Sequence, residues 1–176
     1  PLAAYVVYRD QKWQRDPVGT QLRLLAKLTA TAAGTAFGRA HDLATVRIPA
    51  DLARQVPVRD YEALKPYLDR TQAGEADVLW PGRPLYLAKT SGTTSGTKYI
   101  PITRDSIHNH INGAKDALLY YIHRTARGQF LDGKLIFLSG SPELELHHGI
   151  RTGRLSGIAN HHVPAYLRRN QLPSYA

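Results

Sequence analysis

The alternation of apolar and polar residues divides the chain into a helical first part and a mixed second part. Over residues 2–13, and again from Asp16-Pro17 onward, apolar side chains recur every three or four positions, as on one face of an amphipathic helix. The second of these segments has a strong start, because aspartate caps a helix and proline suits its first turn. Gly34 is a typical stop signal. We therefore predict two successive helices before residue 35.

Residues 35–74 are predicted to be helical in shorter pieces. Thr35 can cap a short helical turn, whereas residues 44–58 contain two prolines and are expected to be irregular. Asp60 is predicted to begin another helix. That helix should break near Lys65, because Pro66 removes a backbone hydrogen bond, and a second helical piece through Tyr67 and Leu68 should end at Gly74.

Short apolar runs bounded by turn residues characterise the second part of the chain. The runs 85–89, 99–102 and 134–138 are predicted to be strands, and the last of them is expected to be buried. Between the second and third runs, Thr103 caps the longest predicted helix, which extends toward Gly128. Its predicted apolar face consists of Ile107, Ile111, Ala114, Leu118, Tyr121 and Ile122.

The carboxyl-terminal residues carry weaker signals. The glycine-rich, basic stretch 149–157 is expected to be a connecting loop, residues 165–172 a short helix, and residues 173–176 a frayed end. Together the elements predict an α/β fold, in which a mainly helical part (1–75) precedes mixed strands and a covering helix (76–176).

The most distinctive stretch joins the first two predicted strands. It is dense in hydroxyl groups, contains two glycines and ends in a lysine. Glycines let backbone N–H groups converge, N–H and hydroxyl groups donate to phosphate oxygens, and lysine adds a positive charge. The pattern is neither a Walker A loop nor a dinucleotide fingerprint, and a flexible linker is rarely flanked so closely by apolar strands. We interpret it as an anion-binding loop made of Thr90, Ser91, Gly92, Thr93, Thr94, Ser95, Gly96, Thr97 and Lys98.

Composition and charge narrow the range of functions. The chain has 23 lysines and arginines against 14 acidic residues, for a net charge of +9, and no cysteine. The positive charges are scattered and no nucleic-acid-binding motif is present, so nucleic acid is not the partner that we favour. Disulfides and thiolate chemistry are excluded, and no apolar stretch approaches the roughly 18 residues of a membrane span. We favour a cytoplasmic protein that handles small anions and has no membrane partner.

The hydroxyl-rich stretch also resembles the phosphate loop of adenylate-forming enzymes, the superfamily of acyl-CoA synthetases and firefly luciferase. Its flanks are similar to the auxin-responsive-promoter family of acyl-acid–amido synthetases, both upstream, in 56–62 and Lys65-Pro66-Tyr67, and downstream, in 98–101. Phe37-Gly38-Arg39 and Gly133-Lys134-Leu135 have comparable segments there. Members of that family are several-fold longer, so the chain is expected to be an amino-terminal fragment of the large adenylation domain. The loop of the plant members carries one more residue between its second glycine and its lysine.

The resemblance implies a reaction in two steps. A carboxylic acid attacks the α-phosphate of ATP to give an acyl-adenylate and pyrophosphate, and an amino acid then takes the acyl group to form an amide. Residues 91–98 would bind the triphosphate, with Lys98 balancing the charge of the departing pyrophosphate. Mg²⁺ is expected with ATP, but no ligand for it can be named, and the chain without the remainder of the polypeptide is expected to be inactive. The helix after the loop would border the acid pocket, with Asn112, Lys115 and Tyr120 as candidate contacts.

Two other functions stay open at this stage. A non-catalytic module could bind a nucleotide or another anion without turning it over, and a basic fragment could bind nucleic acid. The pairs His147-His148 and His161-His162 do not indicate a metal site, because neighbouring side chains diverge in strands and in helices. Neither a cysteine nor an HExxH motif accompanies them.

Overall fold

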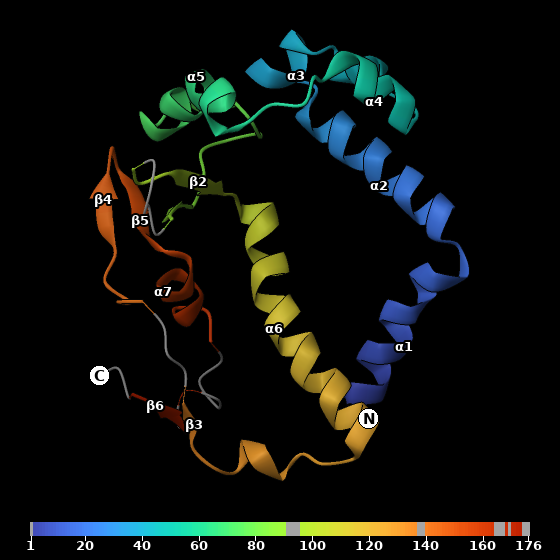
Figure 1. Ribbon diagram of the computed structural model, residues 1–176, viewed down its shortest axis with the longest axis vertical. Helices are drawn as coiled ribbons and strands as arrows, with labels where there is room; N and C mark the ends of the chain where they lie inside the picture. The colour runs from blue at the N-terminus through green and yellow to red at the C-terminus, as the bar shows by residue number, and fades with distance from the viewer. Residues whose placement is uncertain (1, 91–95, 137–139, 164–167, 169, 174–176) are drawn as a thin grey trace.

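The computed structural model describes residues 2–90, 96–136, 140–163, 168 and 170–173. The first two helices, α1 (Leu2–Arg15) and α2 (Pro17–Ala32), form the blue arm in Figure 1. The Asp16 carboxylate accepts the Gly19 N–H at 2.9 Å and so caps α2, as predicted. The short helix α3 (Ala36–Ala40) follows, capped by Thr35 as predicted.

Residues 44–58 are more regular than predicted. They include most of the 3₁₀ turn η1 (Leu43–Thr45) and all of the helix α4 (Pro49–Gln55), so the expected irregular stretch was wrong. The prolines do not prevent helix formation, because Pro49 occupies the first turn, where its missing N–H is not needed. The Asp51 carboxylate also accepts the N–H groups of Arg47 and Ile48 at 3.0 and 3.1 Å, which satisfies donors at the start of α4.

Helix α5 (Tyr61–Gln72) continues through Pro66, so the predicted break does not occur. The helix starts where predicted, with the Asp60 carboxylate accepting the Ala63 N–H at 2.8 Å. Pro66 costs one hydrogen bond on an exposed side of the helix, where water can reach the carbonyl group left without a partner. Burial of Leu68 and Thr71 on the other side supports the second half of the helix.

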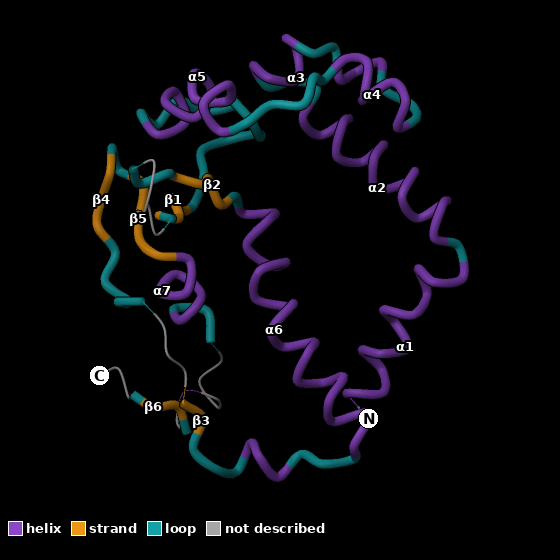
Figure 2. The backbone as a smooth tube through the Cα atoms, viewed as in Figure 1, coloured by secondary structure: helices purple, strands orange, loops and turns teal. Residues whose placement is uncertain are grey.

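A four-stranded mixed sheet forms the centre of the second part, with its strands orange in Figure 2. Its order is β2-β1-β5-β4, in which β1 and β5 are parallel and the two outer pairs are antiparallel. The bounds are β1 (Tyr86–Lys89), β2 (Tyr99–Ile102), β4 (Glu145–His147) and β5 (Ile150–Arg154). Strands β1 and β2 confirm the prediction. The prediction for residues 149–157 was wrong, because this stretch, which was expected to be a connecting loop, contains β5, and β5 pairs with a strand on each side.

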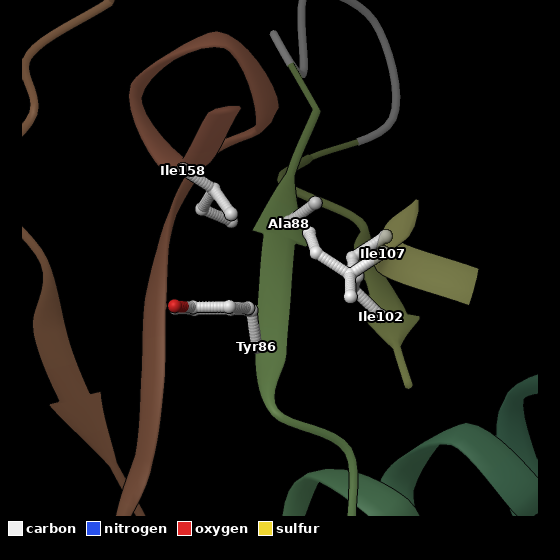
Figure 3. Packing of buried hydrophobic residues seen from close by; sticks show 5 residues of the cluster. All are labelled: Tyr86, Ala88, Ile102, Ile107 and Ile158. Carbon is white, nitrogen blue, oxygen red and sulfur yellow. The ribbon is translucent and has the colours of Figure 1, made fainter. Parts of the chain in front are cut away.

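The core of this part lies on one face of the sheet. Figure 3 shows how side chains from β1, β2 and two helices meet there, namely α6 (Arg104–Thr125) and α7 (Leu155–Asn160). The buried members are Tyr86, Ala88, Ile102, Ile107 and Ile158. On the other face of β1, Leu87 is fully buried, so this strand is covered on both sides.

Helix α6 confirms the predicted long covering helix, with Thr103 as its cap. Its apolar face is only partly covered, because Ile107 is buried whereas Leu118 and Tyr121 are exposed. The helix ends at Thr125, before the predicted Gly128, with Ala126 in a left-handed conformation. Helix α1 packs against α6, and Arg9 forms an ion pair with Asp116 at 3.0 Å.

The remaining elements are short. A 3₁₀ turn, η2 (Gln129–Leu131), leads to a two-stranded parallel sheet of β3 (Leu135–Ile136) and β6 (Gln171–Leu172). Strand β3 was predicted, but Ile136 is 74% exposed, so the expectation of a buried strand was wrong there. Strand β6 contradicts the end of the helix expected over 165–172. Residues 137–139, 165–167, 169 and 174–176 lie outside the described part of the chain.

The fold is α/β, with helices at the amino end followed by a mixed sheet and its covering helices, as predicted. Among the helices that the structure describes, none is both long and apolar enough to cross a bilayer.

Candidate functional site

The hydroxyl-rich stretch connects two neighbouring strands of the sheet. Strand β1 ends at Lys89 and β2 begins at Tyr99, so the nine residues 90–98 join an antiparallel pair. Most hairpin loops have two to five residues, so this loop is longer than usual. Residues 91–95, which hold most of the predicted phosphate donors, lie outside the described residues, whereas Thr90 and 96–98 lie within them.

The base of this loop is closed by two hydrogen bonds between its first and last residues. The Thr90 N–H donates to the Lys98 carbonyl oxygen at 3.0 Å, and the Lys98 N–H donates to the Thr90 hydroxyl oxygen at 3.2 Å. Gly96 has φ +80°, a conformation that glycine adopts without strain. Among the described residues other than its neighbours in the chain, none has an atom within 4 Å of where a Cβ on Gly96 would be.

The Lys98 side chain lies over an aromatic ring. Its ammonium nitrogen is 5.0 Å from the centroid of the Tyr61 ring, within the range of a cation–π interaction. The same tyrosine accepts the Tyr99 N–H through its hydroxyl oxygen at 3.0 Å. Among the residues that the structure describes, no carboxylate forms an ion pair with Lys98, so no acidic partner neutralises its charge there.

The lysine at the other end of the loop is in a different environment. The Lys89 ammonium donates to the Glu145 carboxylate at 2.5 Å. This hydrogen bond and the positive charge of Lys89 lower the pKa of Glu145 below its ordinary value. Lys89 therefore has a local counter-ion, whereas Lys98 has none in the described part of the chain.

The loop leaves the sheet at the edge where ligands commonly bind. Lys89 and Arg154 lie opposite each other at the carboxyl ends of the parallel strands β1 and β5. Figure 3 shows these two strands side by side in a close view. In open α/β sheets, ligand sites form outside the carboxyl ends of parallel strands. Lys98 and Arg154 make this edge basic, which suits an anionic ligand, whereas the charge of Lys89 is offset by Glu145. Arg154 was not among the predicted site residues, because its stretch was interpreted as a loop.

The candidate acid-pocket residues on α6 are only partly brought together. The Lys115 ammonium donates to the Asn112 side-chain oxygen at 2.9 Å. Tyr120 is exposed and lies on another side of the helix, since five residues correspond to a rotation of about 140°.

The histidines beside the sheet make ring contacts. The Tyr99 ring stacks on His147 with centroids 5.5 Å apart, and His147 meets His148 edge-on. The His162 ring nitrogen lies 3.2 Å from the Tyr86 hydroxyl. Burial lowers the pKa of His162, and the neighbouring His161 and His108 act in the same direction.

A cavity of about 320 Å³ lies away from the loop, between α2, the turn before β1 and the start of α6. Trp80 lines it, and the indole N–H donates to the Asp105 carboxylate at 2.9 Å. Trp80 also packs against the buried residues Ala32, Leu43 and Val46, which agrees with the packing role expected for it. None of the predicted site residues within the described ranges lines this cavity.

Comparison with solved structures identifies the class of fold. A GH3.15 acyl acid amido synthetase superposes with a TM-score of 0.73 over 89% of this chain and 28% of its own, at 22% identity. The AtGH3.15 acyl acid amido synthetase in complex with 2,4-DB superposes with a TM-score of 0.64 over 76% of this chain and 24% of its own, at 24% identity. At these identities the likeness establishes a shared fold.

The sequence comparison then gives the family. Residues 9–174 match the GH3 family N-terminal domain, and the chain belongs to this family. Jasmonoyl–L-amino acid synthetase GH3.3 of Oryza sativa subsp. japonica is 29% identical over 94 residues, which are 53% of this chain and 20% of that protein. The chain thus spans about a fifth to just over a quarter of the length of these relatives. The resemblance to acyl-acid–amido synthetases is confirmed.

Proposed function

We propose that this chain supplies the triphosphate-binding loop of an ATP-dependent acyl-acid–amido synthetase, within the amino-terminal part of its large adenylation domain. The observation that carries the proposal is the position of Lys98. It closes a long loop at the carboxyl edge of a parallel strand pair, with no acidic partner among the described residues. Membership of the GH3 family supports the same reaction.

In the first step, a carboxylate oxygen of the acid attacks the α-phosphorus of ATP. The new bond gives the acyl-adenylate, and the bond from the α-phosphorus to the bridging oxygen breaks, releasing pyrophosphate. Negative charge develops on that leaving group, and a fixed ammonium close to it lowers the barrier. Lys98 serves this role, and the hydroxyl and N–H groups of residues 91–97 donate to the phosphate oxygens. In the second step, the amine of an amino acid attacks the acyl carbon and displaces AMP.

The described residues contain no cluster of side chains that identifies a metal site. No three histidine, aspartate or glutamate side chains converge in the described ranges, and the carboxylate of Glu145, at the same end of the sheet, is paired with Lys89. We therefore assign no step to a metal held by these residues.

The acid substrate is expected to contact α6, where Asn112 and Lys115 are half-buried and Tyr120 is exposed. Lys115 and Asn112 are joined by a hydrogen bond and could bind a carboxylate together, whereas Tyr120 would act separately. The relatives suggest the first acids to test, namely jasmonic acid, after the jasmonoyl–amino acid synthetase, and 2,4-DB, after the AtGH3.15 complex.

The test uses the full-length polypeptide and two matched lysine variants. Lys98→Ala is expected to slow acid-dependent pyrophosphate exchange by tenfold or more, since a charge-assisted contact contributes roughly 1.5–3 kcal/mol. Lys89→Ala removes the same charge at the other end of the loop, where Glu145 already pairs with it, and is expected to change the rate by less than threefold. The free energy of unfolding in urea should stay within about 0.5 kcal/mol of the parent protein for both variants, because both lysines are partly solvent-accessible and neither belongs to the buried core.

Equal effects of the two substitutions would contradict the role of Lys98. ATP binding without any pyrophosphate exchange, across a panel of aromatic and aliphatic acids, would instead indicate a non-catalytic nucleotide-binding module. The chain of 176 residues on its own is expected to release neither pyrophosphate nor amide, because an adenylate-forming site needs closure and exclusion of water.

A further inference from the structure

We infer that Tyr61 is a positioning residue for the triphosphate-binding lysine, an inference that rests on the proposed function. Tyr61 is the first residue of α5 and lies 38 residues before Tyr99 in the sequence. It nevertheless contacts two consecutive residues at the end of the loop, through two different parts of its side chain.

The ring of Tyr61 holds the charged end of Lys98. With 5.0 Å between the ammonium nitrogen and the ring centroid, the cation lies over the negative face of the aromatic ring. A lysine side chain has four rotatable bonds, and fixing it only when ATP binds would cost conformational entropy. Contact with the ring restricts the side chain before ATP binds.

The hydroxyl group of Tyr61 fixes the backbone from which Lys98 extends. It accepts the Tyr99 N–H at 3.0 Å, so the first peptide of β2 is tied to the start of α5. The Tyr99 ring in turn stacks on His147 of β4, with only 9° between the ring planes. The exit of the loop is thereby held from two elements, and the two groups of Tyr61 act on the same short segment.

The start of α5 is itself fixed, which makes Tyr61 a rigid support. Asp60 caps the helix one residue before it, and α5 packs on β2 through the same end. A support on a capped helix holds a side chain more accurately than one on a loop. The geometry therefore assigns to Tyr61 the task of pre-organising Lys98 for the phosphate groups.

The experiment is a double-mutant cycle on acid-dependent pyrophosphate exchange by the full-length polypeptide. Tyr61→Leu is expected to lower kcat/KM for ATP about fivefold, the effect of losing a cation–π contact and its support. Tyr61→Phe keeps the ring and is expected to recover at least half of that loss on a logarithmic scale. In the Lys98→Ala background, Tyr61→Leu is expected to have less than a twofold effect, because the residue it positions is gone.

Tyr67→Leu provides the control. Tyr67 lies on the same helix and its ring packs edge-on against Phe37, away from Lys98. Its loss is expected to lower the urea midpoint while leaving kcat/KM for ATP within twofold. The rate of Lys98 acetylation in the absence of ATP, measured by mass spectrometry with Lys89 as an internal reference, gives a readout that does not depend on activity, and Tyr61→Leu should raise it severalfold.

The outcomes separate the two claims. If Lys98→Ala slows the exchange but Tyr61→Leu does not, the positioning role is wrong and the proposed function stands. If Tyr61→Leu costs the same fivefold in both backgrounds, its effect is general and the positioning role is also wrong. If Lys98→Ala has no effect, the proposed function itself fails.

Discussion

The two glycine-rich basic stretches of this chain have opposite structural roles. The loop over 90–98 joins two strands, and Gly96 uses a left-handed conformation. The stretch 149–157 is instead part of the packed interior of the sheet and of α7. A Cβ on Gly153 would lie 2.6 Å from the Leu144 side chain, and one on Gly157 would lie 2.2 Å from the Ser141 carbonyl oxygen. Glycine in the first stretch allows a left-handed backbone conformation, and in the second stretch it mainly allows neighbouring atoms to pack closely.

The turn that begins the second stretch explains why it becomes a strand. His148 and Gly149 are the two residues between β4 and β5, and both have positive φ, at +49° and +80°. Positive φ at both central residues is the mark of the two-residue hairpin turn that matches strand twist. The burial of Ile150 and Thr152 then fixes β5 inside the sheet. Glycine content alone therefore says little, and the side chains between the glycines decide the structure.

The largest expected effect is on the packed stretch. Gly157→Ala should destabilise the protein by about 2 kcal/mol, because its new methyl group meets backbone atoms of Ser141, which cannot rotate away. Gly113→Ala is the matched control, since Gly113 is also helical, and outside its own helix backbone no described residue has an atom within 4 Å of a Cβ position there. That control should gain up to about 1 kcal/mol from helix propensity. Urea unfolding of the two variants provides the measurement, and a neutral Gly157→Ala would show that this part of α7 is loosely packed.

A smaller effect is expected in the loop, and there it should appear mainly in activity. Gly96→Ala places a Cβ on a left-handed residue, which costs about 1 kcal/mol of strain, or roughly fivefold in pyrophosphate exchange if the active loop bears it. Gly96→Asn should retain more activity than Gly96→Ala, because asparagine tolerates this conformation better. The reverse order of the two variants would mean that the backbone conformation of Gly96 does not matter for ATP use.

The smallest effect concerns the ion pair between Lys89, which precedes the first stretch at the end of β1, and Glu145, at the start of β4. Lys89 lowers the pKa of Glu145, so this carboxylate stabilises the fold above its ordinary pKa near 4.5. That contribution is lost as the pH falls through the lower, folded-state pKa. Glu145→Gln should therefore leave stability at pH 7 nearly unchanged, because the pair is exposed, and should make stability fall less steeply below pH 4.5. Denaturation midpoints at pH 7, 5, 4 and 3.5 would measure this, and parallel curves would contradict it.

Local signals in the sequence were sufficient for the helix caps and for the first two strands. Asp16, Thr35, Asp60 and Thr103 each accept a backbone N–H three residues later, a contact that depends only on nearby residues. The elements that were predicted wrongly depend on contacts with residues far away in the sequence, or on packing that offsets an unfavourable residue. Strand β5 needed the neighbouring strands to bury it, and α5 tolerates Pro66 because its other side is buried.

The residues of the candidate site also divide into those that local sequence predicts and those that depend on distant contacts. Lys98 was predicted from its own loop, in which hydroxyl groups, glycines and a lysine follow one another. The role of Tyr61 could not be predicted, because its contact with Tyr99 joins residues that are 38 positions apart. A tyrosine at the start of a helix carries no sequence pattern that indicates such a contact. Arg154 was missed because the strand that places it at the sheet edge was not predicted.

The hydrogen-bonded base of the loop has an evolutionary consequence. The first and last residues of the loop are hydrogen-bonded to each other and continue into paired strands. The pairing of the strands therefore does not depend on how many residues lie between them. Closing a loop of ten residues instead of nine costs only about 0.1 kcal/mol more. The plant relatives that this loop resembles carry such an extra residue, and a change of that size would leave the register of β1 and β2 intact. Insertions and deletions between Thr90 and Lys98 can thus occur with little selection on folding, so natural variation in the length of this loop would reflect selection on its function.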